Sequence, residues 1–256
     1  MTLALASMPL WQSFTLVVVV GTLLGMLGPA LLRRWLGLDR LRSNNEVAGF
    51  KFAVVGVLYA VNLGFATVVT WEKFRDAQDT VMQEAGAVTA LARLASGLEP
   101  ADGHAMQQQL RDYARAVIDQ DWPAMGRGSY SPAVTRRLEA LYSAIVRHDA
   151  HAQEAPALSA IYGELDAVTQ ARRARIALAD GIIPGVIWWI LVGGAVITVL
   201  FTFFFGSANL LAQVMMNGLL SFLVFVSLWA IVEINFPFAG PVHVSALPME
   251  VFLDDH

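Results

Sequence analysis

The sequence predicts an all-α membrane protein, in which a four-helix transmembrane bundle carries a helical, water-soluble domain inserted between spans two and three. Three observations predict this class. Hydrophobic residues make up 56% of the 256 residues and charged residues only 15%, which is more apolar surface than a soluble domain buries. Residues 72–180 hold 12 of the 17 Lys and Arg residues and 15 of the 21 Asp and Glu residues. Residues 181–232, in contrast, contain no ionisable side chain.

Two spans precede the charged region, within residues 1–70. Residues 10–32 contain no ionisable residue and are long enough to cross a hydrocarbon core of about 30 Å. A cleaved signal peptide is the alternative, but no Lys or Arg precedes this long apolar run, so we expect it to be retained. The second span is expected at residues 50–70, followed by Trp71, a residue type common at membrane interfaces.

Residues 182–233 predict the other two spans, at 184–205 and 210–232, joined by the turn Gly206-Ser207-Ala208-Asn209. Residues 234–256 are left as a C-terminal tail. We therefore expect a multi-pass integral membrane protein in the lipid bilayer, with a bacterial-type inner (plasma) membrane as its location.

Residues 71–181 show helical periodicity throughout and predict the water-soluble domain. Apolar residues follow the 3,4 spacing of a coiled-coil seam, and breaks near 97–103, 122–132 and 148–156 give about four helices. The three stripes are Val81, Glu84, Val88, Leu91, Ala95 and Leu98; Leu138, Leu141, Tyr142 and Ile145; and Leu158, Ile161, Tyr162, Leu165 and Val168. Because no breaker lies between Thr70 and Ala77, span two should continue into the first aqueous helix, and the last aqueous helix should run toward Pro184 and span three.

Several function classes are not expected. The chain has no cysteine and a formal net charge of only −4 without a basic block, so neither thiol chemistry nor nucleic-acid binding is predicted. Side chains of metal-ligand type gather at His148, Asp149, His151 and Glu154, but their setting in a polar loop favours solvated side chains over a metal site. No nucleophile elbow, phosphate-binding loop or zinc-protease motif occurs, so we expect neither an enzyme nor a cofactor.

One face of span two and its extension is a candidate wall of a pore. An 11-residue step turns an α-helix through three turns plus about 20°, which places Asn62, Lys73 and Glu84 nearly in line. Around an axis of several subunits, these residues would form rings of amide, ammonium and carboxylate. The alternative is that this face packs inside one bundle, with Glu84 paired to an Arg of a neighbouring helix. The full set of pore-lining candidates is Val55, Tyr59, Asn62, Ala66, Lys73 and Glu84.

Spans three and four also carry polar residues. Gln213, Asn217 and Ser221 recur every four residues on span four, as Gly194, Thr198 and Thr202 do on span three. This spacing favours helix packing and interhelical hydrogen bonds over a transport path. Glu233, where span four ends, is either an interfacial carboxylate or a group that couples to gating.

Several segments resemble the bestrophin-like membrane proteins. They are NEVAGF at residues 45–50, VVGVLYAV at 54–61, WEKFRDA at 71–77, QEA at 83–85 and PFAG at 237–240. The family motif residues are Trp71, Glu72, Pro237, Phe238 and Gly240. The resemblance implies a distant relation to bestrophins, which are pentameric anion channels whose second transmembrane helix lines the pore. Their acidic calcium clasp has no recognisable counterpart in this sequence.

Together, the residues and the resemblance predict a homo-oligomeric ion channel in which the second transmembrane helix lines the pore. The conducted species would be inorganic ions, with anions implied by the resemblance, from which the expectation of a pentamer also comes. The alternative is a membrane-anchored helical sensor or assembly scaffold that conducts nothing, in which the coiled-coil stripe binds a partner.

Overall fold

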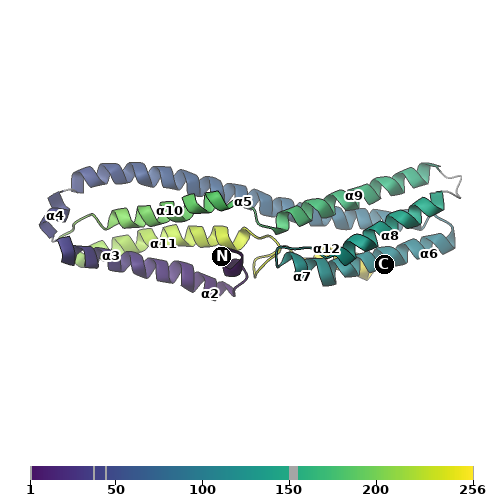
Figure 1. Ribbon diagram of the computed structural model, residues 1–256, viewed down its shortest axis with the longest axis horizontal. Helices are drawn as coiled ribbons and strands as arrows, with labels where there is room; N and C mark the ends of the chain where they lie inside the picture. The colour runs from purple at the N-terminus through teal and green to yellow at the C-terminus, as the bar shows by residue number, and fades with distance from the viewer. Residues whose placement is uncertain (1, 37, 44, 150–154, 256) are drawn as a thin grey trace. The chain divides into compact units, whose positions relative to one another are not determined.

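The computed structural model describes residues 2–36, 38–43, 45–149 and 155–255. The described chain divides into two compact units, one formed by residues Met1–Glu72 and Ile182–Asn235 and the other by Lys73–Gly181 and Phe236–His256. Helix α5 (Asn45–Ala95) has its first part in unit 1 and its second part in unit 2. The expected all-α fold with an uninterrupted helix from span two into the aqueous region is confirmed (Figure 1).

Unit 1 is the membrane part. Short helices α1 (Thr2–Ala6) and α2 (Leu10–Phe14) lead through a π-helical turn, η1 (Thr15–Val19), into α3 (Val20–Leu36) and α4 (Leu38–Ser43). The first part of α5, α10 (Gly185–Thr202) and α11 (Leu210–Ile234) complete it. Within the described residues, four helical stretches are long and apolar enough to cross a membrane: Leu10–Trp35, Asn45–Ala95, Gly185–Thr202 and Leu210–Ile234.

Glycines let α3 and α11 approach closely in unit 1. A Cβ atom at Gly25 would lie 2.0 Å from Oγ of Ser221 on α11, and one at Gly21 would lie 2.6 Å from the ring of Phe225. Because membrane helices gain no hydrophobic energy by leaving lipid for each other, such close backbone approach is a main source of their association. One side of α5 is not covered by the other helices of the chain. This uncovered side exposes Val57, Leu58, Phe65 and Val68.

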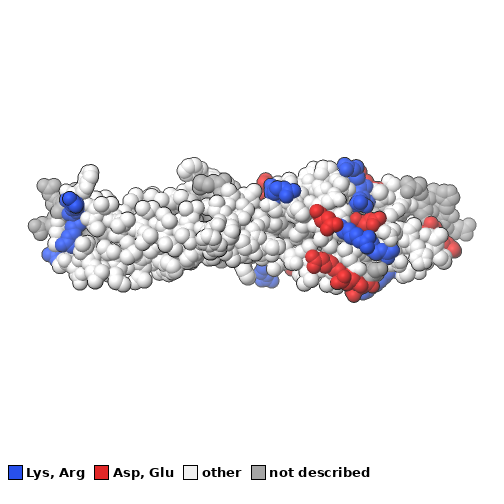
Figure 2. Space-filling view, turned by 90° about the horizontal axis from the view of Figure 1, so that it is seen from below, with Lys and Arg blue, Asp and Glu red and all other residues white. Residues whose placement is uncertain are grey.

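Unit 2 is a helical bundle with its own apolar core. It contains the second part of α5, α6 (Pro100–Ala116), the π-helical turn η2 (Val117–Asp121), α7 (Trp122–Met125), α8 (Pro132–Asp149) and α9 (Ala155–Ala179). Residues 236–256, treated above as a separate tail, add α12 (Leu247–Asp255), which packs Met249 and Phe252 into the core. In Figure 2 the side chains of unit 1 are almost all white, whereas those of unit 2 include many acidic and basic groups.

The last aqueous helix runs toward span three, as expected, but ends before span three begins. Helix α9 ends at Ala179 and α10 begins at Gly185. Gly181 lies between them with φ +93°, and a Cβ atom there would lie 2.6 Å from the ring of Phe236, so this position requires glycine. Pro184 then lacks an N–H and caps the start of α10.

Candidate functional site

Helix α5 buries one stripe of side chains, and this stripe follows a coiled-coil period. Its members include Tyr59, Ala66, Thr70, Ala77, Val81, Glu84, Val88, Leu91 and Ala95, and Phe74, Ala85, Ala87 and Ala92 are buried beside it. Steps of three, four and seven residues correspond to 3.5 residues per turn relative to the neighbouring helices. Glu84 belongs to this buried stripe, whereas Asn62 and Lys73 are exposed. The three residues therefore do not share one face of the bundle.

Three of the pore-lining candidates are buried within the chain. Glu84 has none of its surface exposed, Tyr59 is 7% exposed and Ala66 is 9% exposed, so in this conformation all three face the chain's own helices. Tyr59 packs against Gly194, where a Cβ atom would lie 2.5 Å from the tyrosine ring. Val55 is partly buried.

Asn62 and Lys73 are the candidates that remain exposed on α5. The side-chain amide of Asn62 donates to the backbone oxygen of Leu58 at 2.8 Å, which holds it along the helix. Lys73 forms an ion pair of 2.8 Å with Asp76 one turn further on, and both side chains are about half exposed. These two polar groups mark the uncovered side of α5 inside and just beyond its apolar stretch.

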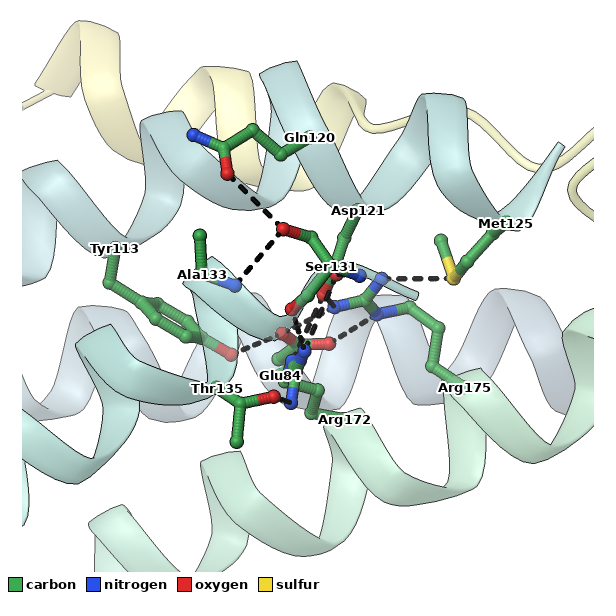
Figure 3. Close-up of polar contacts among 10 residues, drawn as sticks. All are labelled: Glu84, Tyr113, Gln120, Asp121, Met125, Ser131, Ala133, Thr135, Arg172 and Arg175. Atoms are coloured by element: carbon green, nitrogen blue, oxygen red, sulfur yellow. Dashed lines mark hydrogen bonds and ion pairs between the residues drawn. The ribbon is translucent and has the colours of Figure 1, made fainter. Parts of the chain in front are cut away.

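Glu84 lies at the centre of a buried charge cluster formed by Glu84, Tyr113, Asp121, Arg172 and Arg175 (Figure 3). Arg175 on α9 donates from Nε to Oε2 of Glu84 at 2.6 Å and from Nη2 to Oε1 at 2.9 Å. The phenol of Tyr113 on α6 donates to the same Oε1 at 2.7 Å. The alternative in which Glu84 pairs with an Arg of a neighbouring helix is therefore confirmed.

Asp121 holds the second half of the charge cluster. Arg172 donates to its carboxylate from Nε at 2.9 Å and from Nη2 at 3.3 Å, and Arg175 reaches it from Nη2 at 3.4 Å. The backbone N–H of Ser131 donates to Oδ1 of Asp121 at 2.8 Å, and Arg172 also donates to Thr135 Oγ1 at 3.1 Å. These bonds attach the start of α8 to α9 and η2.

The π-helical turn η2 positions Asp121. The wider turn ends at Asp121 itself and is followed at once by Trp122 and Pro123. The Trp122 ring lies under the Arg175 guanidinium, with Cζ 4.7 Å from the ring centroid, and Nη1 of Arg175 contacts the sulfur of Met125 at 3.2 Å. The turn and α7 after it therefore present the Asp121 carboxylate to both arginines, and an aromatic face and a sulfur to Arg175.

The electrostatics of the charge cluster favour charged arginines and a neutral tyrosine. Two carboxylates face two guanidinium groups, so the formal charges cancel. Burial alone would lower the pKa of Arg175, but the neighbouring Glu84 carboxylate outweighs it and the pKa is raised. Burial, and then the charge of Glu84, hold the pKa of Tyr113 well above its ordinary value. The charge cluster is suited to fixing α5, α6 and α9 in one setting, because its charged groups are already paired with one another.

The motif at residues 237–240 lies in unit 2 and packs against Trp122. Phe238 is 4% exposed and meets the Trp122 ring edge to face, with centroids 5.9 Å apart. Gly240 has φ +73°, which favours glycine. The indole N–H of Trp122 donates to the backbone oxygen of Val244 at 3.1 Å. In unit 1, by contrast, the motif residues Trp71 and Glu72 are exposed on α5.

The polar residues singled out on α11 by their spacing, and Glu233 at its end, are buried. Gln213, Asn217 and Ser221 are 2%, 7% and 0% exposed, and the amide of Gln213 donates to the backbone oxygen of Phe205. Glu233 is 3% exposed; its Oε1 accepts from the Ser13 hydroxyl at 2.7 Å, while the indole of Trp229 donates to Ser13 at 3.0 Å. Among the residues described, Oε2 of Glu233 has no hydrogen-bond partner.

The possible metal ligands His148, Asp149, His151 and Glu154 have side chains that lie outside the described residues. Within the described part of the chain, no group of three or more His, Cys, Asp or Glu residues is placed to hold a metal ion.

Sequence reasoning missed Asp121, Tyr113, Arg172, Arg175 and Ser13. A signal was present for the two arginines. The third stripe, Leu158, Ile161, Leu165 and Val168, continues in steps of four and three to Arg172 and Arg175, so both occupy core positions of α9. Asp121 likewise follows Ala114 and Val117 at core spacing. A charged residue at a core position requires a buried partner of opposite sign.

Comparison with known families identifies the family of this chain. The profile described as the bestrophin-like domain matches residues 19–249. This chain belongs to the bestrophin-like family. A comparison with functionally curated proteins gives no match. The four apolar spans and the family together make it an integral membrane protein.

Crystal structures of a bacterial bestrophin homologue from Klebsiella pneumoniae share the fold of this bestrophin-like protein. One point-mutant form is 15% identical, with a TM-score of 0.71 over 94% of this chain and 97% of that chain. Another form, solved with zinc phasing, is 17% identical, with a TM-score of 0.66 over 93% and 97% of the two chains. At this identity, the likeness establishes the fold.

Proposed function

We propose that this bestrophin-like protein is a homo-oligomeric ion channel, with the uncovered side of α5 lining the conduction path. The observation that carries the proposal is the exposure of α5. Only 11% of its apolar membrane-spanning window is buried within the chain, yet this side carries the amide of Asn62 and, just beyond the membrane stretch, the ammonium of Lys73. A polar group on the open side of a membrane helix is costly unless it faces water or another subunit.

In a ring of subunits with the α5 helices around its axis, these polar groups would face water or another subunit. In such a ring Asn62 would meet its copies around the axis, and Lys73, paired with Asp76, would lie at one mouth of the path. Anion conduction and the pentameric number are taken from the family resemblance. Val55 is the remaining apolar candidate along this path. We assign no catalytic role to the chain and place it in a bacterial-type inner membrane.

The structure gives the scaffold alternative less support. That alternative was motivated by the stripe that contains Val81, Val88 and Leu91 and was expected to bind a partner. All three side chains are at most 1% exposed, because they pack inside unit 2 of the same chain. The stripe is therefore not available to another protein in this conformation.

Ion flux through purified protein in liposomes tests the proposal. Vesicles with the protein should pass chloride down its gradient and build the corresponding potential, whereas protein-free vesicles should not. The reversal potential under opposed chloride and potassium gradients then assigns the preferred ion. Protein that is assembled in the vesicles but electrically silent would contradict the proposal.

A further inference from the structure

Unit 1 contains an open pocket of about 640 Å³ where α10 ends and α11 begins. Its walls come from α4, the start of α5, the loop at residues 206–208 and the first turns of α11. Asn45 fixes one wall, since its amide donates to the backbone oxygen of Gly206 at 2.8 Å and accepts from the N–H of Gly206 at 2.9 Å. The pocket is thus held by side-chain hydrogen bonds.

The polar lining of the pocket suits an anion. Arg42 contributes a cation, and among the side chains that the structure describes no Asp or Glu lines the pocket. Asn217 also lines the pocket; it is 93% buried, being 7% exposed, and its Nδ2 has no hydrogen-bond partner among the described residues. A buried donor without a partner has lost its hydrogen bonds to water without replacement, and a bound acceptor would restore one. The pocket therefore offers a charge and a hydrogen bond to one negatively charged group.

The remaining lining is apolar and aromatic. Phe52 and Phe205 meet edge to face with centroids 5.7 Å apart, and Met216 and Leu220 add aliphatic surface. A small inorganic anion would make no favourable contact with this apolar surface. A molecule with an anionic head and a hydrocarbon part matches both halves of the pocket.

The position of the pocket points to the same class of ligand. It lies at the ends of two spans, where α10 stops at Thr202 and α11 starts at Leu210, which is the depth of lipid head groups. Arg33 donates to the backbone oxygen of Ser207, a lining residue, at 3.2 Å. Basic side chains appear in blue at this end of unit 1 in Figure 2, and such clusters attract anionic lipids.

We propose that this pocket binds the phosphate of an anionic phospholipid, with Arg42 supplying the charge, Asn217 the hydrogen bond and Phe52 with Phe205 the apolar contact. The proposal is independent of whether the protein conducts ions. Inorganic phosphate shares the head-group chemistry but lacks the hydrocarbon part, so the two ligands can be separated by experiment.

Native mass spectrometry of the detergent-purified full chain tests the proposal. Phosphatidylglycerol, phosphatidylcholine and inorganic phosphate are titrated separately. The wild type should retain phosphatidylglycerol about tenfold more tightly than phosphatidylcholine, which corresponds to one charge-assisted contact. Arg42→Gln should remove most of this preference, and Asn217→Leu should reduce it.

Arg34→Gln is the matched control, because it removes an exposed arginine from the same end without touching the pocket lining. It should leave the preference within about twofold of the wild type. The exposed Arg42→Gln variant keeps the test valid if the buried Asn217→Leu variant does not fold. Equal losses in Arg34→Gln and Arg42→Gln, no preference in the wild type, or competition by inorganic phosphate at lipid-like concentrations would each overturn the proposal.

Discussion

Arg175 donates two hydrogen bonds to Glu84, of 2.6 Å and 2.9 Å, although 91 residues separate them in the sequence and neither side chain reaches solvent. An ion pair of this kind gives little net stability over apolar residues, but the loss of one partner leaves a charge buried without compensation. The pair therefore links α5 to α9, and substitution of either residue alone should destabilise the protein.

Glu84→Gln should destabilise unit 2 by about 3 kcal/mol, because the Arg175 charge then keeps only the longer contact to Asp121. Thermal and denaturant unfolding of the detergent-solubilised protein measures the change. The exposed Glu139→Gln on α8 is the matched control and should be neutral. The double variant Glu84→Leu, Arg175→Met should recover part of the loss. An altered ion selectivity with unchanged unfolding would show instead that Glu84 faces the conduction path.

Lys73→Glu should lower the permeability of chloride relative to potassium several-fold, because it reverses the charge that we place at the mouth of the path. Reversal potentials in liposomes or planar bilayers measure the ratio. Arg75→Glu makes the same charge change two residues further on, about 200° around α5, and should shift the ratio less. Equal shifts in both variants would indicate a general surface effect.

The raised pKa of Tyr113 predicts that the protein loses stability in alkali. Burial and the adjacent Glu84 carboxylate raise the pKa of Tyr113 in the folded protein, whereas the same tyrosine in the unfolded chain has a pKa of about 10. Below about pH 10 both states hold the proton, so this stability is fully present. Above it the unfolded state loses the proton first, and stability should fall by about 1.4 kcal/mol per pH unit until the folded pKa is reached.

Unfolding at pH 9, 10 and 11 measures this effect, with tyrosinate absorbance followed in parallel. Tyr113→Phe should reduce the alkaline slope and cost about 1.5–3 kcal/mol at neutral pH, through the lost hydrogen bond to a charged acceptor. Tyr130→Phe, at a 53% exposed position, is the control and should keep the wild-type slope. An identical slope in Tyr113→Phe would exclude Tyr113 as its source.

Gly25→Ala should destabilise the membrane bundle by about 1–3 kcal/mol, since the new Cβ atom would lie 2.0 Å from Oγ and 2.7 Å from Cβ of Ser221. Gly64→Ala adds the same methyl group where no atom lies within 4 Å and should be tolerated. Monodispersity and melting temperature of the purified protein compare the two. Equal behaviour would show that α3 and α11 can move apart without cost.

The spans were predictable because apolar length is a strong signal. Residues 10–32, 184–205 and 210–232 were expected from the absence of charge, and the structure has helices at Leu10–Trp35, Gly185–Thr202 and Leu210–Ile234. The uninterrupted α5 followed from the lack of a breaker between Thr70 and Ala77. The break before α10 was missed because it depends on Gly181 and its contact with Phe236, which is 55 residues away.

The candidate site was predictable only in part. An ideal α-helical period placed Glu84 in line with Asn62 and Lys73, whereas in the structure those two are exposed and Glu84 is buried against Tyr113 and Arg175. The partners of Glu84 come from other helices, and a single sequence carries no pairing information. The arginines at core positions of α9 were visible as an anomaly, but their acidic partners could be identified only by the fold.

The charge cluster also sets an order of events during synthesis. Glu84 and Asp121 leave the ribosome before Arg172 and Arg175, and at roughly 5–20 residues per second the 91 residues from Glu84 to Arg175 take about 5–18 s. During that time both carboxylates must stay hydrated, so the helices that carry them cannot close around a dry core. The bundle of unit 2 is therefore expected to consolidate only after α9 has been made, and nascent chains that stop before Arg172 should remain sensitive to protease.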